Sequence, residues 1–212
     1  MKLNRALLLI LLAIVAVMPV AAQFRYSPLV GVTISDLKFK QDIFPVSKAV
    51  GAQAGVIGEM MFSGIGFGLD LGLLYNQMGA NTNLGDRKIW SSDGFGKEHV
   101  MLHTLQIPLH LRFKWTRLEG LEDYVAPFIS GGPDLALCFA HSKIKGNPGV
   151  KNPFKYAGGD VGLTFGGGFE LFKRWQLSVQ YTWGMSYLVR TRKLDNMSAR
   201  NRQLAIRLNY FF

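Results

Sequence analysis

The chain has 212 residues, of which 49% are hydrophobic, 12% aromatic and only 18% charged, and its formal net charge at pH 7 is +10. Its single cysteine, Cys138, excludes an intramolecular disulfide framework. A soluble domain of this composition would hide its apolar side chains in continuous or helical runs, whereas here they fall on alternate residues. The composition therefore favours a β-rich protein that contacts lipid.

The N-terminal segment has the parts of an export signal. Two basic residues precede an apolar run at 6–17, and small residues follow at 20–22, where a signal peptidase cuts. The sequence predicts a signal peptide over residues 1–22, cleaved after Ala22, and one domain over residues 23–212. A retained membrane helix is the alternative, but the apolar run is shorter than the ~20 residues that such a helix needs.

The clearest strand pattern covers residues 105–115. Every odd position from Leu105 to Trp115 is apolar, whereas the even positions hold Gln106, Pro108, His110, Arg112 and Lys114. Only a period of two separates these sets, so the segment is predicted to be a β-strand with one face toward lipid. Seven further strands are predicted, and two prolines leave the phase of the fifth ambiguous. They cover residues 28–36, 49–60, 65–76, 123–138, 160–171, 175–187 and 203–212.

The connections between these segments alternate between long and short. The long ones cover residues 37–48, 78–99, 139–157 and 188–201, and the short ones 61–64, 116–122 and 172–174. Outer-membrane barrels have short periplasmic turns and longer external loops. The sequence therefore predicts an all-β fold, an eight-stranded antiparallel transmembrane β-barrel with both termini in the periplasm. The last strand ends on Phe212, an aromatic end of the kind that barrel-assembly machinery recognises.

The strand faces opposite the apolar ones carry charges that would point into the lumen. An eight-stranded barrel is just wide enough for side chains to fill it, and an unpaired buried charge costs several kcal/mol. We therefore expect a paired charge network across the lumen, with a polar conduction path as the alternative. Its predicted members are Glu59, Asp70, His110, Arg112, Lys114, Glu170 and Arg207.

Much of the positive charge lies in the long connections. We interpret these loops as external segments whose cations meet the phosphate groups of outer-membrane lipid and lipopolysaccharide. An anion- or polysaccharide-binding surface is the alternative, and nucleic acid is disfavoured because an exported barrel does not ordinarily meet it. The basic residues are Lys143, Lys145, Lys151, Lys155, Arg190, Arg192, Lys193, Arg200 and Arg202.

Signals for enzymatic or cofactor chemistry are weak. The four histidines lack the paired spacing of a zinc site, and the glycines at 64–68 lack the helix and acidic residue of a nucleotide site. A loop hydrolase or acyltransferase has candidate residues but no nucleophile-elbow pattern. Those candidates are His99 and His141 with Ser91, Ser92 or Ser142. We expect no enzyme activity, no metal and no cofactor.

Residues 105–113, with the sequence LQIPLHLRF, resemble the central strand of a known outer-membrane β-barrel family. That family includes the PorT-like proteins and porin-family barrels of the Bacteroidetes, and residues 126–133, 162–171 and 180–184 are also similar to it. The likeness covers most of residues 24–212, and its motifs are structural. It implies a barrel in the outer membrane, supplies no catalytic residues, and implies an accessory role in protein secretion as a further hypothesis.

Three functions follow as hypotheses. The first is a non-enzymatic barrel that serves envelope integrity or surface binding. The second is an accessory component of a secretion or assembly complex, and the third is a narrow porin. A soluble barrel of lipocalin type would use the same strands with the faces reversed, so that the aromatic side chains would point inward.

Overall fold

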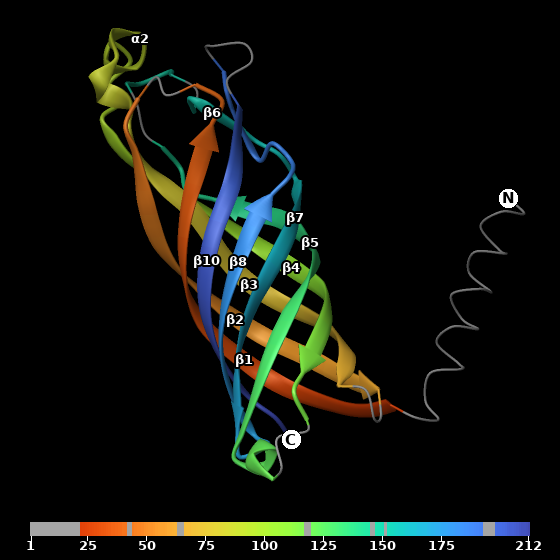
Figure 1. The fold of residues 1–212 in the computed structure, drawn as a ribbon. Coiled ribbons are helices and arrows are strands. Elements are labelled where there is room, and N and C mark those ends of the chain that lie inside the picture. Colours follow the sequence, from red (N-terminus) through yellow and green to blue (C-terminus); the bar gives the residue numbers. More distant parts are fainter. Residues whose placement is uncertain are drawn as a thin grey trace, which may run out of the picture.

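The computed structural model shows a tall, tilted β-barrel (Figure 1). It describes residues 22–41, 44–62, 66–116, 120–144, 147–150, 152–192 and 198–212. Residues 1–21 of the predicted signal peptide lie outside this part of the chain, so cleavage after Ala22 stays a prediction. Among the described residues, no helix has the length and apolar character to cross a membrane.

Eight long antiparallel strands form the barrel wall. Each pairs with its neighbours in the order β1-β2-β3-β4-β5-β7-β8-β10, and β10 pairs with β1 to close the sheet. The predicted fold class is therefore confirmed. The strands are β1 (Ala22–Phe39), β2 (Val46–Phe62), β3 (Phe67–Asn83), β4 (Lys97–Lys114), β5 (Val125–His141), β7 (Gly159–Leu171), β8 (Trp175–Gly184) and β10 (Ser198–Tyr210).

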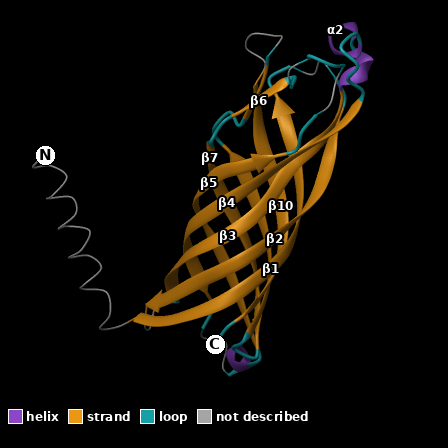
Figure 2. Ribbon diagram, turned by 180° about the vertical axis from the view of Figure 1, so that it is seen from behind, coloured by secondary structure: helices purple, strands orange, loops and turns teal. Residues whose placement is uncertain are grey.

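Short elements decorate both ends of the barrel (Figure 2). At the end with long connections, a one-turn helix follows β3, and two short strands extend the sheet beyond β10. The C-terminus and the start of β1 lie at the opposite end (Figure 1). The short elements are η2 (Leu84–Asp86), α2 (Lys88–Ser91), η3 (Leu121–Asp123), β6 (Phe154–Tyr156) and β9 (Val189–Thr191).

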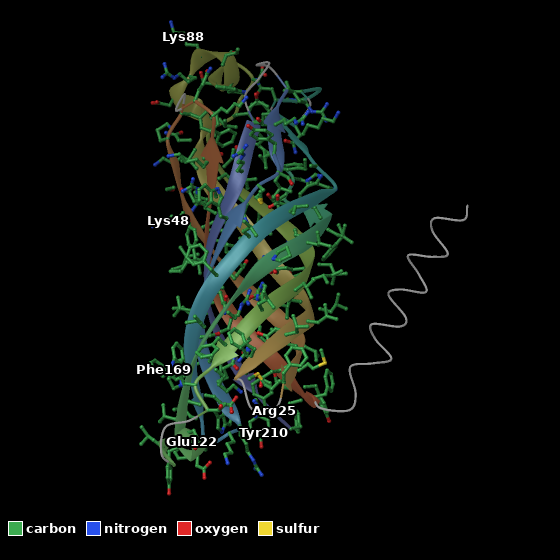
Figure 3. All side chains as sticks on the ribbon, turned by 45° about the vertical axis from the view of Figure 1, so that its right-hand side comes forward. Arg25, Lys48, Lys88, Glu122, Phe169 and Tyr210 are labelled. Atoms are coloured by element: carbon green, nitrogen blue, oxygen red, sulfur yellow. The ribbon has the colours of Figure 1, made fainter. Side chains whose placement is uncertain are left out.

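The outer wall carries a continuous apolar belt. Large hydrophobic side chains point outward from every long strand, as Phe169 and Tyr210 illustrate (Figure 3). Phe67, Leu111 and Phe165 each expose half or more of their surface, although each belongs to a paired strand of the regular sheet. A water-soluble barrel would turn these faces inward, so the reversed, lipocalin-like arrangement is wrong. The belt is the surface that a membrane-embedded barrel presents to lipid.

Beyond the belt, side chains still alternate between the outer and inner faces of the strands, but the outer face becomes polar and the inner face apolar. In β3 the outward positions continue as Gln77 and Asn81, while Met78 and Ala80 point inward and are buried. Water surrounds this part of the barrel, so its apolar side chains pack inside. The predicted loop over residues 78–99 is therefore wrong at both ends, because apolar side chains on the outer face no longer mark the strands there. β3 and β4 are therefore longer than predicted.

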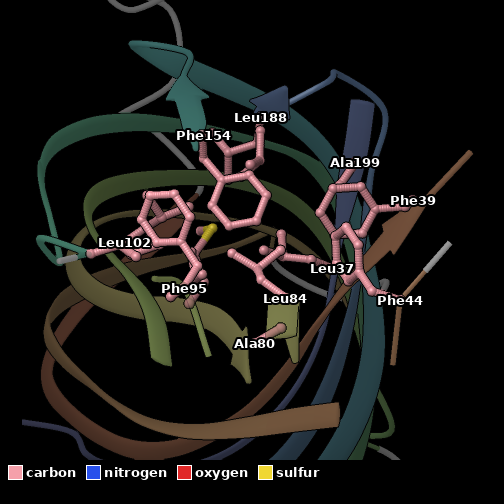
Figure 4. Close-up of a cluster of buried hydrophobic side chains, with 14 of the residues drawn as sticks. Leu37, Phe39, Phe44, Ala80, Leu84, Phe95, Leu102, Phe154, Leu188 and Ala199 are labelled. Atoms are coloured by element: carbon pink, nitrogen blue, oxygen red, sulfur yellow. The ribbon is translucent and has the colours of Figure 1, made fainter. Parts of the chain in front are cut away.

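The inward apolar side chains form a hydrophobic plug across the external end of the lumen (Figure 4). Side chains from β1, β3, β4 and β10 meet others from the external connections, among them Trp90 and Phe154. Phe44 contacts Trp90 edge to face, with ring centroids 5.4 Å apart. The plug comprises Leu37, Phe39, Phe44, Met78, Ala80, Leu84, Trp90, Phe95, Val100, Leu102, Ala136, Ile144, Phe154, Leu188, Val189 and Ala199.

Candidate functional site

The periplasmic half of the lumen is organised around Glu59. This side chain on β2 is fully buried and lies 2.6 Å from Arg25 on β1, 2.8 Å from Lys114 and 3.0 Å from Arg112, both on β4. Glu170 on β7 also pairs with two of these cations, Arg25 at 2.6 Å and Lys114 at 2.7 Å. The two carboxylates and their three cations therefore connect four strands, β1, β2, β4 and β7, across the interior.

Arg112 extends the network toward the middle of the barrel. Its guanidinium donates to both carboxylate oxygens of Asp70 at 2.8–2.9 Å and to the amide oxygen of Gln176 at 2.7 Å. The same group lies over the ring of Phe128, 4.2 Å from its centroid. Among the described residues, three cations balance three carboxylates in this network. Each charge therefore has the compensation that a buried ion needs.

The next layer contains a second, smaller polar group. His110 on β4 lies 3.1 Å from Asp134 on β5, and Thr164 donates to the same carboxylate. Thr164 and Thr182 share a hydrogen bond of 2.7 Å. These contacts fill the lumen between β4, β5, β7 and β8.

Amide side chains fill the remaining middle of the lumen. Arg207 on β10 donates to Gln53 at 2.8 Å, and Gln53 donates to Gln106 at 2.7 Å. Asn76 and Gln203 exchange two hydrogen bonds of 3.0 and 2.8 Å. Within the described chain, Arg207 forms no ion pair with a carboxylate. It therefore lies apart from the charge network that the sequence predicted it to join.

The structure buries all seven predicted lumen residues, and it pairs some of them with Asp134, which is buried, and Arg25, which is partly exposed, neither of which was predicted. Arg25 points inward with the same alternation as Ser27 and Thr33, three residues before the predicted start of that strand. Asp134 was missed because Pro127 and Pro133 obscured the phase of β5. Both prolines lie on the outer side of β5, so Asp134 points inward.

The external basic residues lie partly on strands. Arg200 and Arg202 belong to β10, Arg190 to β9 and Lys155 to β6, because strand pairing continues above the belt. Placing these four in loops was therefore wrong. Lys143 and Arg192 are exposed in connections, as expected. Lys145, Lys151 and Lys193 lie outside the described residues.

The candidate hydrolase residues do not assemble into a catalytic pair. Ser142 donates to the backbone oxygen of His99 at 2.9 Å, while the His99 ring lies 2.5 Å from the amide oxygen of Asn81. The His141 ring stacks on Tyr156, with centroids 4.2 Å apart. Ser91 and Ser92 lie at α2, and in the described part of the chain neither has a hydrogen bond to a histidine ring. The described part of the chain also contains no group of three or more His, Cys, Asp or Glu side chains that could hold a metal ion.

Sequence comparison adds a family to this geometry. The family model described as an outer membrane protein beta-barrel domain matches residues 19–190. The chain belongs to this family. No curated protein matches the sequence.

The chain is also similar to solved structures of outer-membrane proteins. OprG, an outer membrane protein from Pseudomonas aeruginosa, has 13% identity and a TM-score of 0.54, covering 91% of this chain and 97% of OprG. Ail, the attachment invasion locus protein of Yersinia pestis, has 13% identity and a TM-score of 0.43, covering 90% and 99%. Neisserial surface protein A has 8% identity and a TM-score of 0.44, covering 88% and 97%. Because the identities are low, the likeness concerns the fold alone, and the comparison with OprG is the one that supports it.

Membership of this outer-membrane family indicates where the barrel resides. The apolar belt agrees with that location, since it gives each long strand a face suited to lipid. The narrower resemblance to PorT-like proteins of the Bacteroidetes stays a prediction.

Proposed function

We propose that this outer-membrane barrel is non-enzymatic and serves envelope integrity or surface binding, with a lumen closed to solutes. The observation that carries the proposal is the filling of the lumen by two different kinds of structure in series. Ion pairs around Glu59 occupy the periplasmic half, and the hydrophobic plug occupies the external end.

Both structures oppose the passage of ions. Opening the network would separate buried ion pairs, and breaking one such pair costs about 3–5 kcal/mol. The plug offers an ion no polar partner to replace its water of hydration. A path through the barrel would therefore have to overcome two unrelated barriers, which argues against the narrow-porin hypothesis.

Planar-bilayer recording tests the closed lumen. We expect the purified, folded protein to give no steady single-channel conductance. The control is heat-modifiability: the same sample should change its gel mobility on boiling, as a folded barrel does. A reproducible conductance from heat-modifiable protein would contradict the proposal and favour a porin.

The absence of enzymatic activity is tested at the candidate residues. Replacing His99, His141 and Ser142 by alanine should leave the cell's lipid profile unchanged, because these side chains form no nucleophile–base pair. If cells with the wild-type protein modified a lipid and cells with the variants did not, the non-enzymatic proposal would be contradicted. The accessory role in a secretion complex remains the alternative function, and stable co-purification of envelope secretion proteins with the barrel would favour it.

A further inference from the structure

Positive side chains face one another across strands on the outer wall of the external end. Lys38 on β1 lies directly opposite Arg200 on β10, and Arg190 on β9 lies directly opposite Lys155 on β6. Arg190 also pairs with Ser198, two residues from Arg200, so both pairs share one continuous sheet face. We call Lys38, Lys155, Arg190, Arg200 and Arg202 the cationic strip.

Like charges placed directly opposite each other destabilise a sheet. In the described part of the chain, no carboxylate forms an ion pair with any member of the strip. Asp36 lies opposite Arg202 on the same face, but the two side chains do not form an ion pair either. The strip therefore keeps a positive charge that the fold itself does not neutralise.

Aromatic rings hold two of the guanidinium groups in place. Arg200 lies 4.7 Å from the centroid of the Tyr187 ring and donates to its hydroxyl at 3.2 Å. Arg202 lies 5.1 Å from the centroid of the Trp183 ring. The Nε atoms of both arginines are buried without a hydrogen-bond partner among the described residues. These contacts orient the two arginines, and the donors that an anion would meet are the terminal guanidinium nitrogens and not the buried Nε atoms.

The strip lies immediately above the apolar belt. Asp36 and Arg202 face each other at the lower edge of the strip. Two residues further along each strand, about 7 Å away, the facing pair is Ile34 and Leu204, which are both apolar. Trp183 on β8 faces Arg202 on β10 and is half exposed. It lies at the boundary where outer-membrane barrels carry their aromatic girdles. An anion bound here would thus be level with lipid headgroups.

We propose that the cationic strip binds the phosphate groups of a phosphorylated glycolipid in the outer leaflet. This proposal rests on the membrane placement in the proposed function and names the ligand class for its surface binding. Arginine forks match phosphate oxygens in pairs, and the outward apolar side chains below the strip can contact acyl chains of the same molecule. A free anion would gain the first interaction but not the second.

The test uses the full mature barrel in detergent with fluorescently labelled diphosphorylated lipid A, and measures apparent affinity by anisotropy. The double variant K38Q/R200Q removes one facing pair, and K88Q/K97Q removes the same charge from α2 and β4 at the same end. Since each basic residue at a lipid surface contributes about 1 kcal/mol, we expect K38Q/R200Q to bind about thirtyfold more weakly. K88Q/K97Q should bind like the wild type.

The charge reversal K38E provides a second, independent readout. It places a carboxylate opposite Arg200, so it should raise the temperature of the boiling-dependent mobility shift in the absence of lipid A while also weakening lipid A binding. A merely structural role for Lys38 would not move the two measurements in opposite directions. An unchanged or lowered transition temperature would overturn the like-charge argument.

Three results would overturn the proposal. These are wild-type affinity in K38Q/R200Q, equal binding of lipid A stripped of its phosphates, and full displacement of lipid A by inorganic phosphate at equal concentration. The last result would mean that the site takes free anions. Heat-modifiability of every sample separates these failures from loss of the membrane barrel, which would count against the proposed function instead.

Discussion

Glu59 is the residue on which the periplasmic charge network depends most. It is fully buried and is the counter-ion of Arg25, Arg112 and Lys114. The substitution E59Q keeps the shape but leaves two buried cations, Arg112 and Lys114, and the partly buried Arg25 with two carboxylates. We expect a loss of about 3–5 kcal/mol in the free energy of unfolding, measured by urea titration in lipid vesicles.

The matched control for E59Q is K173Q. Lys173 also forms an ion pair, 2.5 Å from Asp123, but both side chains are exposed on the periplasmic side. Exposed pairs of this kind are screened by water and contribute little, so the variant should unfold like the wild type. If E59Q were as stable as K173Q, the network would be a by-product of burial and not a source of stability.

Two aromatic residues follow β10 and point in different directions. Phe211 is buried beneath the guanidinium of Arg25, 4.5 Å from its ring centroid, whereas Phe212 is 67% exposed and stacks on Tyr26. We propose that barrel-assembly machinery recognises the end of the chain through Phe212. The exposed ring is available for such recognition.

Removing the terminal ring tests that proposal. The F212A variant should reach the outer membrane as heat-modifiable protein at a severalfold lower level than the wild type, because the recognised side chain is missing. The control is F24A, which removes an equally exposed aromatic ring, 68% exposed, from β1 at the same end of the barrel. Equal assembly of F212A and F24A would contradict a specific role for the terminal residue.

At the level of strands, alternation in the sequence was sufficient for most of the wall where lipid lies outside and polar side chains lie inside, although it missed Arg25 on β1 and Asp134 on β5. The eight strands, their order and the inward charges of β2, β3, β4 and β7 could all be predicted that way. The external parts of β3 and β4 could not, because Val100 and Leu102 point inward there with the polarity of a water-soluble sheet. A search for strands with apolar outer faces and polar inner faces misses the part of a strand that extends from lipid into water, where the two faces are reversed.

The same limit applies to the candidate site. Alternation shows which face a charge lies on, but ion pairs depend on register across the barrel, which brings Arg25 of β1 to Glu170 of β7. The cationic strip was hidden for a related reason. Its like-charge pairs exist only once β1 faces β10 and β6 faces β9.

The whole molecule has two parts. The charge network fills the periplasmic half of the lumen, and the hydrophobic plug fills its external end. The β1–β10 seam runs unbroken from Leu29 opposite Asn209 to Phe39 opposite Ala199 and thus joins both parts. The network and the plug share no residue, so each should close the lumen without the other.

This independence gives a final prediction about conductance. V100N/L102N makes the plug polar, and D70A/R112A removes two ion pairs, Arg112–Asp70 and Arg112–Glu59, without changing the net charge of the network. Neither double variant should conduct in planar bilayers, because the other barrier remains. The combined variant should show a small conductance, because the plug is then polar and the network has lost the part that reaches the middle of the barrel, although the pairs of Glu59 and Glu170 with Arg25 and Lys114 remain. Conductance in either double variant alone would show that only one of the two structures closes the lumen, whereas silence of the heat-modifiable combined variant would show that the remaining ion pairs or the amide side chains around Gln53 still close it.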